Sequence, residues 1–393
     1  MNNSHIKEIT AITEVLPEGQ KCTGVLLQYD CILGAGTVSP GDFLVKNRHV
    51  TGAEVWRDEE GGPGSGPFLY LSLDPQDEQA PTYFPGQPWE GKDAVIVRPR
   101  LSIRQTGPFR AADGTVIPAA AADETGRVKN LLADEFVQGS FEGLSYNLFI
   151  PRNYDPAKQY PLVQFIHDAA VCGNQPELTL AQGVGALVWM TEEAQAKQEC
   201  FVLAPQFAAP SIVDDDWNVD PRLETEKRLL DKIVSEYSID RGRLYTTGQS
   251  MGCMASMVLN LRYPGLFAAS FFVAGQWDER AFAGSGLERK RFWFLNSQGD
   301  AKAFPGMNQI LVQLERDGAR IAREVWETGE PQETYRKKAH ALLDTGANVI
   351  YTPFEMTSVA DGWHSDGGEH HIHTWRHAYG IEAIREWLFA QHR

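Results

Sequence analysis

A serine between two glycines is the residue of this sequence best placed to act as a nucleophile. Ser250 lies in Gly248-Gln-Ser-Met-Gly252, which follows the Gly-x-Ser-x-Gly pattern. Residues 244–247 are a short run rich in β-formers, and residues 251–263 read as a helix. In that context the serine occupies a strained strand-to-helix turn, and the helix N-terminus can receive a developing oxyanion. The flanking glycines leave room for neighbouring backbone. The stretch therefore predicts a nucleophilic serine.

A serine hydroxyl reacts once a base takes its proton, and the base needs an acid to orient it. In α/β-hydrolases the acid and then the histidine follow the serine along the chain, each on a loop at a strand end. Residues 292–295 are an apolar strand, and the loop after them ends on Asp300. Asp300 is the predicted orienting acid, and a helix-cap or turn role is its alternative.

The histidine belongs to a cluster near the C-terminus. The base is expected in the loop before the closing helix, predicted at residues 381–391. That position favours three histidines, while one other is expected to be helical already and one lies further upstream. The favoured residues are His370, His371 and His373, the helical one is His377, and the upstream one is His364. The i, i+4 spacing of His373 and His377 would suit zinc, but no acid or cysteine stands at a recognised spacing. No metal or other cofactor is predicted.

Two further features concern the oxyanion and the substrate. The first oxyanion donor is the N–H of Met251. The second is expected from the small residues of His167-Asp-Ala-Ala170, which follow a buried strand, with the N–H of Ala169 as first choice. Trp217 and Trp277 are candidate substrate-binding residues, with packing inside the protein as the alternative.

Composition limits the remaining possibilities. A chain of 393 residues with 42% hydrophobic residues suggests two globular domains. A net charge of −16 argues against nucleic acid and anionic membranes. No run of 18 apolar residues or signal-peptide pattern occurs. A cytoplasmic protein is expected, or a secreted one if an export signal lies outside this sequence. The five cysteines lack metal-like spacing and are expected to be mostly buried apolar residues.

Two patterns of elements divide the chain. Up to about residue 120, short strands separated by Gly/Pro-rich breaks predict a β-sandwich, expected to serve packing or assembly. After a small, polar stretch at 119–126, strands alternate with helices, which predicts a mostly parallel sheet with helices on both faces. The expected domains are residues 1–122 and 123–393.

The second domain resembles a known family. Ser238-Ile-Asp-Arg-Gly-Arg-Leu-Tyr-Thr-Thr-Gly-Gln-Ser-Met-Gly252 and the ending His371-Ile-His-Thr-Trp-Arg-His-Ala-Tyr379 are similar to the polyhydroxybutyrate-depolymerase-like and feruloyl-esterase-like branch of α/β-hydrolases. Aligning Trp375 and Tyr379 with that ending selects His371 as the base, with His373 second. One esterase subgroup also carries an N-terminal immunoglobulin-like domain, which fits the β-rich first part.

Departures from the family pattern are expected to matter locally. His-Gly is replaced by His167-Asp168, which brings a carboxylate near the oxyanion loop, and a glycine after the serine is replaced by Cys253. An insertion at roughly residues 327–346 is expected to supply a lid or a substrate wall.

The resemblance and the residue order together predict a serine carboxylesterase acting on a small-molecule or polymeric ester. The alternatives are a prolyl-oligopeptidase-like peptidase, a polyester depolymerase, and a binding protein that keeps the fold without activity. The absence of propeller-like repeats argues against the peptidase architecture. The β-rich domain leaves room for assembly into a homo-oligomer.

Overall fold

The computed structural model describes residues 5–122, 125–360 and 367–393. Its backbone contacts divide the protein into two compact units, each with its own hydrophobic core. The first unit comprises Met1–Phe84 and Ile96–Asp134, and the second comprises Pro85–Val95 and Glu135–Arg393. The second unit thus includes a short segment from within the β-rich first part of the sequence.

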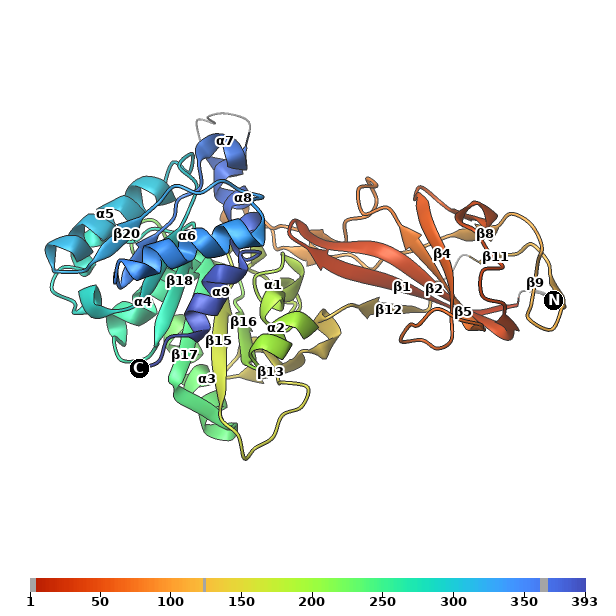
Figure 1. Ribbon diagram of the computed structural model, residues 1–393, viewed down its shortest axis with the longest axis horizontal. Coiled ribbons are helices and arrows are strands. Elements are labelled where there is room, and N and C mark those ends of the chain that lie inside the picture. The colour runs from red at the N-terminus through yellow and green to blue at the C-terminus, as the bar shows by residue number, and fades with distance from the viewer. Residues whose placement is uncertain (1–4, 123–124, 361–366) are drawn as a thin grey trace. The chain divides into compact units, whose positions relative to one another are not determined.

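Strands of two to fifteen residues build the β-rich part of the chain (Figure 1). These strands are β1 (Ile6–Leu16), β2 (Gly19–Leu33), β3 (Phe43–Val45), β4 (Val50–Trp56), β5 (Gly66–Leu73), β6 (Tyr83–Phe84), β7 (Val95–Ile96), β8 (Ile103–Gln105), β9 (Phe109–Arg110), β10 (Val116–Ile117), β11 (Ala121–Ala122) and β12 (Arg127–Asn130). The largest of their sheets has the order β12-β1-β2-β5-β4, and smaller sheets have the orders β11-β8-β3, β10-β9 and β6-β7.

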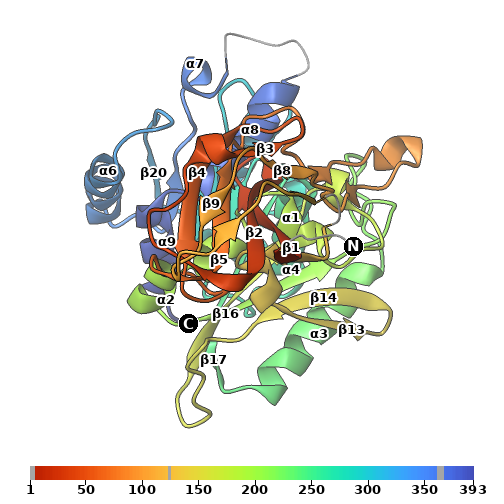
Figure 2. The same cartoon turned by 90° about the vertical axis from the view of Figure 1, so that its right-hand side faces the viewer.

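The alternation of side chains along β5 explains the core of the first unit. Leu69, Leu71 and Leu73 are buried and alternate with less buried residues, the period of two that a half-buried strand requires. From the other face of β5, Tyr70 stacks on Trp56 with ring centroids 4.5 Å apart. Figure 2 shows β2, β4 and β5 side by side in this sheet. The predicted β-sandwich domain is thus present.

One edge of the sandwich differs from the expected antiparallel pattern. β12 pairs in parallel with β1, with Thr10 opposite Arg127. The first unit consequently extends to Asp134, further along the chain than the expected boundary after residue 122. The four residues of β12, Arg-Val-Lys-Asn, are mostly polar. They therefore carry no sequence signal for a strand.

A mixed sheet forms the centre of the second unit. Its strands are β13 (Val137–Phe141), β14 (Leu144–Phe149), β15 (Tyr160–Ile166), β16 (Phe201–Gln206), β17 (Ile239–Gln249), β18 (Ala269–Val273), β19 (Phe292–Leu295), β20 (Ile321–Arg323) and β21 (Val349–Tyr351). In the described residues they follow the order β13-β14-β16-β15-β17-β18-β19-β21-β20. β13 and β14 pair antiparallel, and the strands from β16 to β20 pair in parallel, as predicted.

Helices cover both faces of this sheet (Figure 1). They are α1 (Leu178–Ala181), α2 (Glu192–Lys197), α3 (Arg222–Glu236), α4 (Met251–Arg262), α5 (Ala303–Arg316), α6 (Gln332–Asp344), α7 (Met356–Val359), α8 (Gly368–Ala378) and α9 (Glu382–Phe389). Phe272 of β18 packs in a core cluster with residues of α3, α4 and α5. Its neighbour Phe271 contacts Tyr379, which directly follows α8. Neighbouring side chains of a strand therefore reach opposite helical layers.

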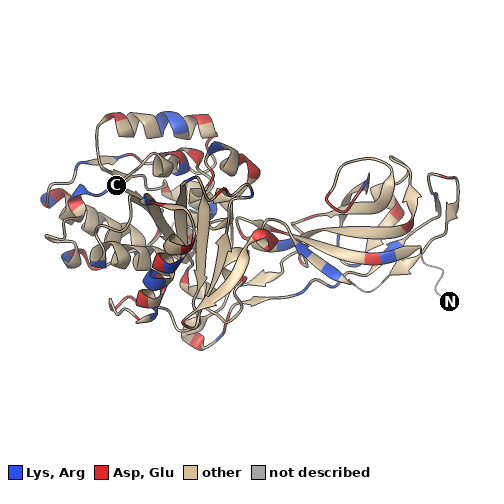
Figure 3. Cartoon of the chain, turned by 90° about the horizontal axis from the view of Figure 1, so that it is seen from below, with Lys and Arg blue, Asp and Glu red and all other residues tan. Residues whose placement is uncertain are grey.

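Burial on both faces accounts for the apolar strands. Every residue of β15, β16 and β18 is buried. In Figure 3 the central strands of this unit are tan, while Lys, Arg, Asp and Glu colour the surrounding helices and loops. A parallel sheet covered on both faces requires such continuous apolar strands. None of the helices within the described residues has the length and apolarity needed to cross a membrane.

The insertion at residues 327–346 is a covering helix, so the expectation of a lid or substrate wall is wrong. α6 contacts α9 and β20. Tyr335, Ala339 and Leu342 of α6 are buried, and the ring of Tyr335 packs against Trp326. On the outer side, Arg336 forms ion pairs with glutamates of α6 and α9. The apolar face of α6 is therefore used for packing against β20 and α9.

Candidate active site

Ser250 occupies a strained turn between β17 and α4. Its φ of 51° and ψ of −118° lie in a region that residues with a side chain rarely adopt. The turn is held on one side by a hydrogen bond from the Ser250 N–H to the Val273 carbonyl of β18, at 3.1 Å. The predicted strand–serine–helix arrangement is therefore present, and it places Ser250 where β17 ends.

The two flanking glycines are needed because the backbone passes close to β15. A Cβ on Gly252 would lie 1.9 Å from the carbonyl oxygen of Ile166. A Cβ on Gly248 would lie 2.7 Å from the same oxygen and 2.5 Å from the Gly252 carbonyl carbon. These distances exclude any side chain and explain the Gly-x-Ser-x-Gly spacing. Behind the turn, Cys253 is fully buried and burial raises the pKa of its thiol well above the usual value.

His371 is the histidine that faces the serine. Its Nε2 lies 2.8 Å from the Ser250 Oγ, and its Nδ1 lies 2.6 Å from the Asp300 Oδ2. The side chain is 25% exposed, so one edge of the imidazole is open to solvent or substrate. The ring of Trp375, one helical turn further along α8, packs edge-on against it at 5.1 Å. Ser250, His371 and Asp300 thus form a continuous line of hydrogen bonds.

Asp300 lies in the loop after β19 and is 2% exposed. Its Oδ1 accepts hydrogen bonds from the N–H groups of Lys302 at 3.1 Å and Ala303 at 2.9 Å. Burial by itself would raise the pKa of this carboxyl. The charge of His371 and the hydrogen bonds from His371, Ala303 and Lys302 outweigh burial and lower it below the usual value. Asp300 is therefore ionised at neutral pH. A carboxylate only accepts hydrogen bonds, so the His371 Nδ1 donates and Nε2 remains free to accept the Ser250 proton.

The other described histidines of the cluster point elsewhere. His370 is buried with its Nδ1 3.2 Å from the Ser297 Oγ, and the His373 Nδ1 lies 3.3 Å from the Val359 carbonyl oxygen. The ring of His377 faces Phe354. His364 lies outside the described residues. The expectation that the base sits in a loop is wrong, because α8 already begins at Gly368. Successive helical residues point in different directions, so one helix can direct His371 alone at Ser250.

The two expected oxyanion donors lie at the starts of neighbouring helices. Met251 is the first residue of α4, whose first N–H groups have no carbonyl of their own helix to bind. Ala169 begins the short 3-10 helix η4 (Ala169–Val171) directly after β15. The N–H of Ala170 donates to the Asp168 Oδ1 at 2.9 Å, and the N–H of Val171 to the Asp168 carbonyl at 3.2 Å. The N–H of Ala169 is not used by either bond.

Asp168 has a local structural role. Besides the Ala170 N–H, its carboxylate accepts a hydrogen bond from the Gln249 Nε2 at 3.0 Å, and Gln249 also donates to Gln182. Burial raises the pKa of Asp168, and the bonds from Gln249 and Ala170 offset part of this rise. The carboxylate that replaces the family glycine therefore caps η4. Gln249 and Gln182 were not singled out in the sequence, because no local pattern marks a glutamine as the partner of a loop over eighty residues away.

His167 holds the start of the same loop by hydrogen bonds. The Phe207 N–H donates to its Nε2 at 3.0 Å, which leaves Nδ1 to donate to the Asp168 carbonyl at 2.7 Å. Burial lowers the pKa of His167 to about 4, so its ring is neutral. These bonds fix the start of the loop that carries Ala169, and its end is fixed by the Gly173 N–H, which donates to the Phe207 carbonyl at 3.0 Å.

The two candidate tryptophans pack against each other. Trp217 and Trp277 meet edge to face with ring centroids 5.4 Å apart, and Trp277 is 6% exposed. Trp217 has a positive φ of 66°, and the neighbouring Asp215 accepts hydrogen bonds from Gln276 and Lys302. The pair therefore lies beside the loops that follow β18 and β19, which include Asp300.

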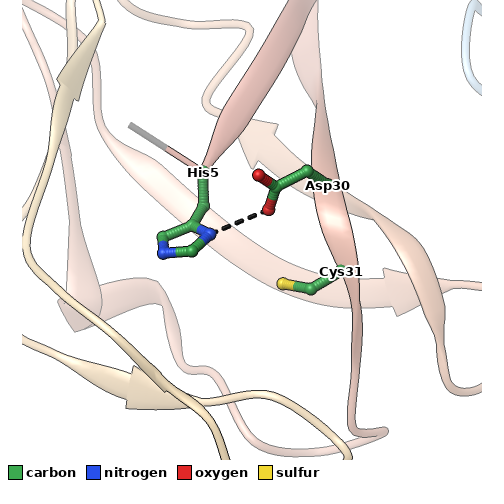
Figure 4. Close-up of side chains that lie close together, drawn as sticks. All are labelled: His5, Asp30 and Cys31. Carbon is green, nitrogen blue, oxygen red and sulfur yellow. Dashed lines mark hydrogen bonds and ion pairs between the residues drawn. The ribbon is translucent and has the colours of Figure 1, made fainter. Parts of the chain in front are cut away.

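The possible metal ligands of the described residues form two groups, both in the first unit. They are His5, Asp30 and Cys31 (Figure 4), and His49, Asp74 and Asp77. In the first group the His5 Nδ1 lies 2.8 Å from the Asp30 Oδ1, and Lys7 lies 3.4 Å from the other carboxylate oxygen. These ion pairs account for the arrangement. All five cysteines lie in the described ranges and are free, and four of them are buried, Cys31 being intermediate.

Known proteins resemble both parts of the chain. Residues 8–118 match the family model of the esterase Ig-like N-terminal domain. The whole structure is similar to that of a thermostable esterase, with a TM-score of 0.82 and 25% sequence identity over 99% of this chain and 100% of the other. A shorter match to acetylxylan esterase A of Emericella nidulans is 27% identical and covers 20% of this chain but only 30% of that relative.

The sandwich, the doubly covered sheet and the serine turn define an α/β-hydrolase with an additional β domain. Together with these matches, they make the chain similar to esterases that carry an N-terminal immunoglobulin-like domain.

Proposed function

We propose that the protein is a serine carboxylesterase that forms an acyl-enzyme on Ser250. The observation that carries this proposal is the line of hydrogen bonds from the Ser250 Oγ through His371 to Asp300, at 2.8 Å and 2.6 Å. A serine needs both a base within hydrogen-bond distance and an acid that fixes the tautomer of that base. All three groups occur here in the chain order of α/β-hydrolases.

In the first half-reaction His371 takes the Ser250 proton as the Oγ attacks the ester carbonyl. The carbonyl oxygen becomes negatively charged and is stabilised by the N–H groups of Met251 and Ala169, an effect worth about 3–4 kcal/mol per donor in known cases. Asp300 stabilises the imidazolium that forms. His371 then gives its proton to the departing alcohol as the carbon–oxygen bond breaks, which leaves the acyl group on Ser250.

The second half-reaction repeats these steps with water. His371 removes a proton from the water that attacks the acyl carbon, and the same two N–H groups receive the oxyanion. Collapse of this intermediate releases the carboxylic acid and returns the proton to Ser250. Trp217 and Trp277 are proposed to form an apolar wall for the ester, because Trp277 follows β18, whose Val273 carbonyl holds the Ser250 N–H.

Variants at Ser250 test the proposal directly. Ser250→Ala is expected to lower kcat on p-nitrophenyl acetate by about 10³-fold or more, since it removes the nucleophile. A panel of p-nitrophenyl esters of increasing chain length, assayed beside a peptide p-nitroanilide, distinguishes an esterase from a peptidase. Turnover of the esters by Ser250→Ala at the wild-type rate would show that the mechanism is wrong.

A pair of histidine variants tests the base. His371→Ala is expected to lose activity by a similar factor, whereas His373→Ala, a matched change two residues along α8, is expected to keep kcat within about threefold. His373 contacts the Val359 carbonyl and not Ser250. Collapse of activity in His373→Ala with normal turnover in His371→Ala would assign the base to His373.

A further inference from the structure

The segment Pro85–Val95 packs with the catalytic unit although it is part of the β-rich sequence. It falls within residues 8–118, which match the Ig-like domain, yet its contacts place it in the second unit. Two backbone hydrogen bonds join its two ends. The Gln87 N–H donates to the Lys92 carbonyl at 2.7 Å, and the Lys92 N–H donates to the Gln87 carbonyl at 3.1 Å. Between them lies the short 3-10 helix η2 (Pro88–Glu90). The segment is therefore an ordered hairpin and not an extended linker.

This hairpin lies along the loop that carries Ala169. The Gly86 N–H donates to the Ala170 carbonyl at 2.7 Å. Further along, the Asn174 Nδ2 contacts the Asp93 Oδ2 at 3.5 Å, and Ala94 is 2% exposed. The closest of these contacts is thus a backbone hydrogen bond one residue away from the expected oxyanion donor.

The hydrogen bonds of the loop show what Gly86 adds. The Ala170 N–H is held by the Asp168 carboxylate at 2.9 Å, and the Cys172 N–H by the Ala169 carbonyl at 3.1 Å. These two bonds fix the peptide plane between Ala169 and Ala170. The next plane contains the Ala170 carbonyl, and its partner is the Gly86 N–H. The Val171 N–H shares this rigid plane with the Ala170 carbonyl, and it donates to the Asp168 carbonyl at 3.2 Å. The Asp168 carbonyl in turn shares a peptide plane with the Ala169 N–H. Holding the Ala170 carbonyl therefore restricts the orientation of the Ala169 N–H.

We propose that Gly86 is a positioning residue for acyl transfer: its backbone N–H holds the Ala170 carbonyl and so keeps the Ala169 N–H directed at the oxyanion. This inference rests on the proposed function of Ser250. The β-rich part of the sequence thereby supplies a structural element of the catalytic centre. Oxyanion stabilisation depends on donors that are fixed before the reaction, so loosening the loop costs catalysis more than substrate binding.

The position tolerates only glycine. A Cβ on Gly86 would lie 2.5 Å from the Ala94 nitrogen, 2.7 Å from the Lys92 carbonyl oxygen and 2.8 Å from the Asp93 carbonyl carbon. All three are backbone atoms of the same hairpin, so they cannot move aside as a flexible side chain would. A methyl group at residue 86 must therefore shift the hairpin relative to its bond with Ala170.

The test compares Gly86→Ala with Gly91→Asn in the full-length protein. Gly91 lies in the same hairpin at a φ of +70°, and a Cβ there would meet nothing within 4 Å. This position therefore tolerates asparagine, which adopts positive φ more readily than most residues. Gly86→Ala is expected to lower kcat on p-nitrophenyl acetate by about 10- to 100-fold with KM within about threefold, since a displaced donor weakens transition-state binding. Gly91→Asn is expected to keep both constants. The affinity of a trifluoromethyl ketone, which forms a tetrahedral oxyanion on the serine, should fall in parallel with kcat/KM in Gly86→Ala.

Several results would overturn the inference. Wild-type kcat in a folded Gly86→Ala protein would do so, as would an equal loss of kcat in Gly91→Asn or a loss confined to KM. If Gly86→Ala does not fold, amide hydrogen exchange of the wild-type protein replaces it. Exchange of the Gly86 N–H as fast as that of an exposed amide would show that it does not hold the Ala170 carbonyl, and would also overturn the inference. Ser250→Ala is assayed alongside. Its full activity would refute the proposed function, whereas its inactivity beside an unaffected Gly86→Ala would refute the role of Gly86 alone.

Discussion

Backbone contacts or helical register hold each residue of the proposed triad in place. Ser250 is kept in its strained turn by the Val273 carbonyl, and Asp300 binds the first N–H groups of the segment leading into α5. His371 is directed by the register of α8. Asp300 therefore has two roles at once, because Oδ1 caps the backbone while Oδ2 receives the His371 Nδ1–H.

The two roles of Asp300 are separable by substitution. Asp300→Asn keeps an oxygen for the N–H groups of Lys302 and Ala303 but presents an NH₂ group to the His371 Nδ1. That ring nitrogen must then accept, so Nε2 carries the proton and cannot take one from Ser250. We expect kcat to fall by about 10⁴-fold, as for a wrong tautomer in this kind of triad, with little change in thermal stability. Steady-state kinetics and a thermal melt measure the two effects.

Asp300→Ala is the matched comparison for that prediction. It removes the cap as well as the orienting acid, so it is expected to lose about 0.5–2 kcal/mol of stability in addition to activity. Equal melting temperatures for Asp300→Asn and Asp300→Ala would mean that the backbone bonds of Asp300 do not stabilise the loop. An active Asp300→Asn would remove Asp300 from the mechanism.

At the scale of elements, α3 carries an acidic residue on its buried face. Glu226 is fully buried beside Leu223, Leu229 and Leu230, and within the described residues neither carboxylate oxygen has a hydrogen-bond partner. Burial, with smaller contributions from Asp231 and Glu224, raises its pKa to about 8. Glu226 is thus neutral at pH 7 in the folded protein. An unpaired charge there would cost far more than a protonated carboxyl.

This raised pKa predicts a pH-dependent stability. The unfolded chain releases the Glu226 proton near its ordinary pKa of 4.5, while the folded protein keeps it up to about pH 8. The folded state therefore binds more protons in this window, and the free energy of unfolding falls as pH rises through it. Glu226→Gln, which does not titrate, should be more stable than the wild type by about 2–4 kcal/mol at pH 8.5 and nearly equal at pH 4.5. Urea unfolding at both pH values measures the difference.

The control for Glu226 is Glu236→Gln at the exposed end of the same helix. Glu236 pairs with Lys232 at the surface, and this change is expected to alter stability by less than about 1 kcal/mol at either pH. A stability difference for Glu226→Gln that stays the same from pH 4.5 to 8.5 would show that Glu226 ionises normally in the folded protein.

At the scale of the whole molecule, two hydrophobic cores stabilise two units of the chain. Leu69 belongs to the core of the first unit and Leu259 to that of the second, and both are completely buried. Units with separate cores commonly unfold as separate cooperative transitions. The hairpin Pro85–Val95 means that the two units do not correspond to two continuous stretches of sequence.

Calorimetry of two core variants tests this division. Leu69→Ala and Leu259→Ala should each destabilise one unit by about 2–5 kcal/mol and lower one transition while leaving the other in place. Activity should follow the transition that Leu259→Ala lowers. A single transition that both variants lower equally would show that the protein unfolds as one cooperative body.

Much of this architecture follows from short stretches of sequence. The turn at Ser250 can be predicted locally, because β-formers, two glycines and a helix follow one another directly in the sequence. The same holds for Asp300, since an apolar strand followed by a polar loop predicts where the acid lies. The change from short strands to alternating strands and helices separates the sandwich from the hydrolase sheet for the same reason: each period is a property of neighbouring residues.

The tertiary structure decided which way individual side chains point and which residues far apart in the sequence are in contact. The residue pattern alone does not decide whether His370, His371 or His373 is the base, and the family resemblance favours His371. In the structure, the helical register of α8 turns His371 toward Ser250. The same register turns His370 toward Ser297 and His373 toward Val359. The segment Pro85–Val95 belongs to the second unit because the Gly86 N–H meets the Ala170 carbonyl. A bond between two backbone groups leaves no trace in residue type. Sequence thus determined the local turns and periods, and only packing in three dimensions determined which groups meet.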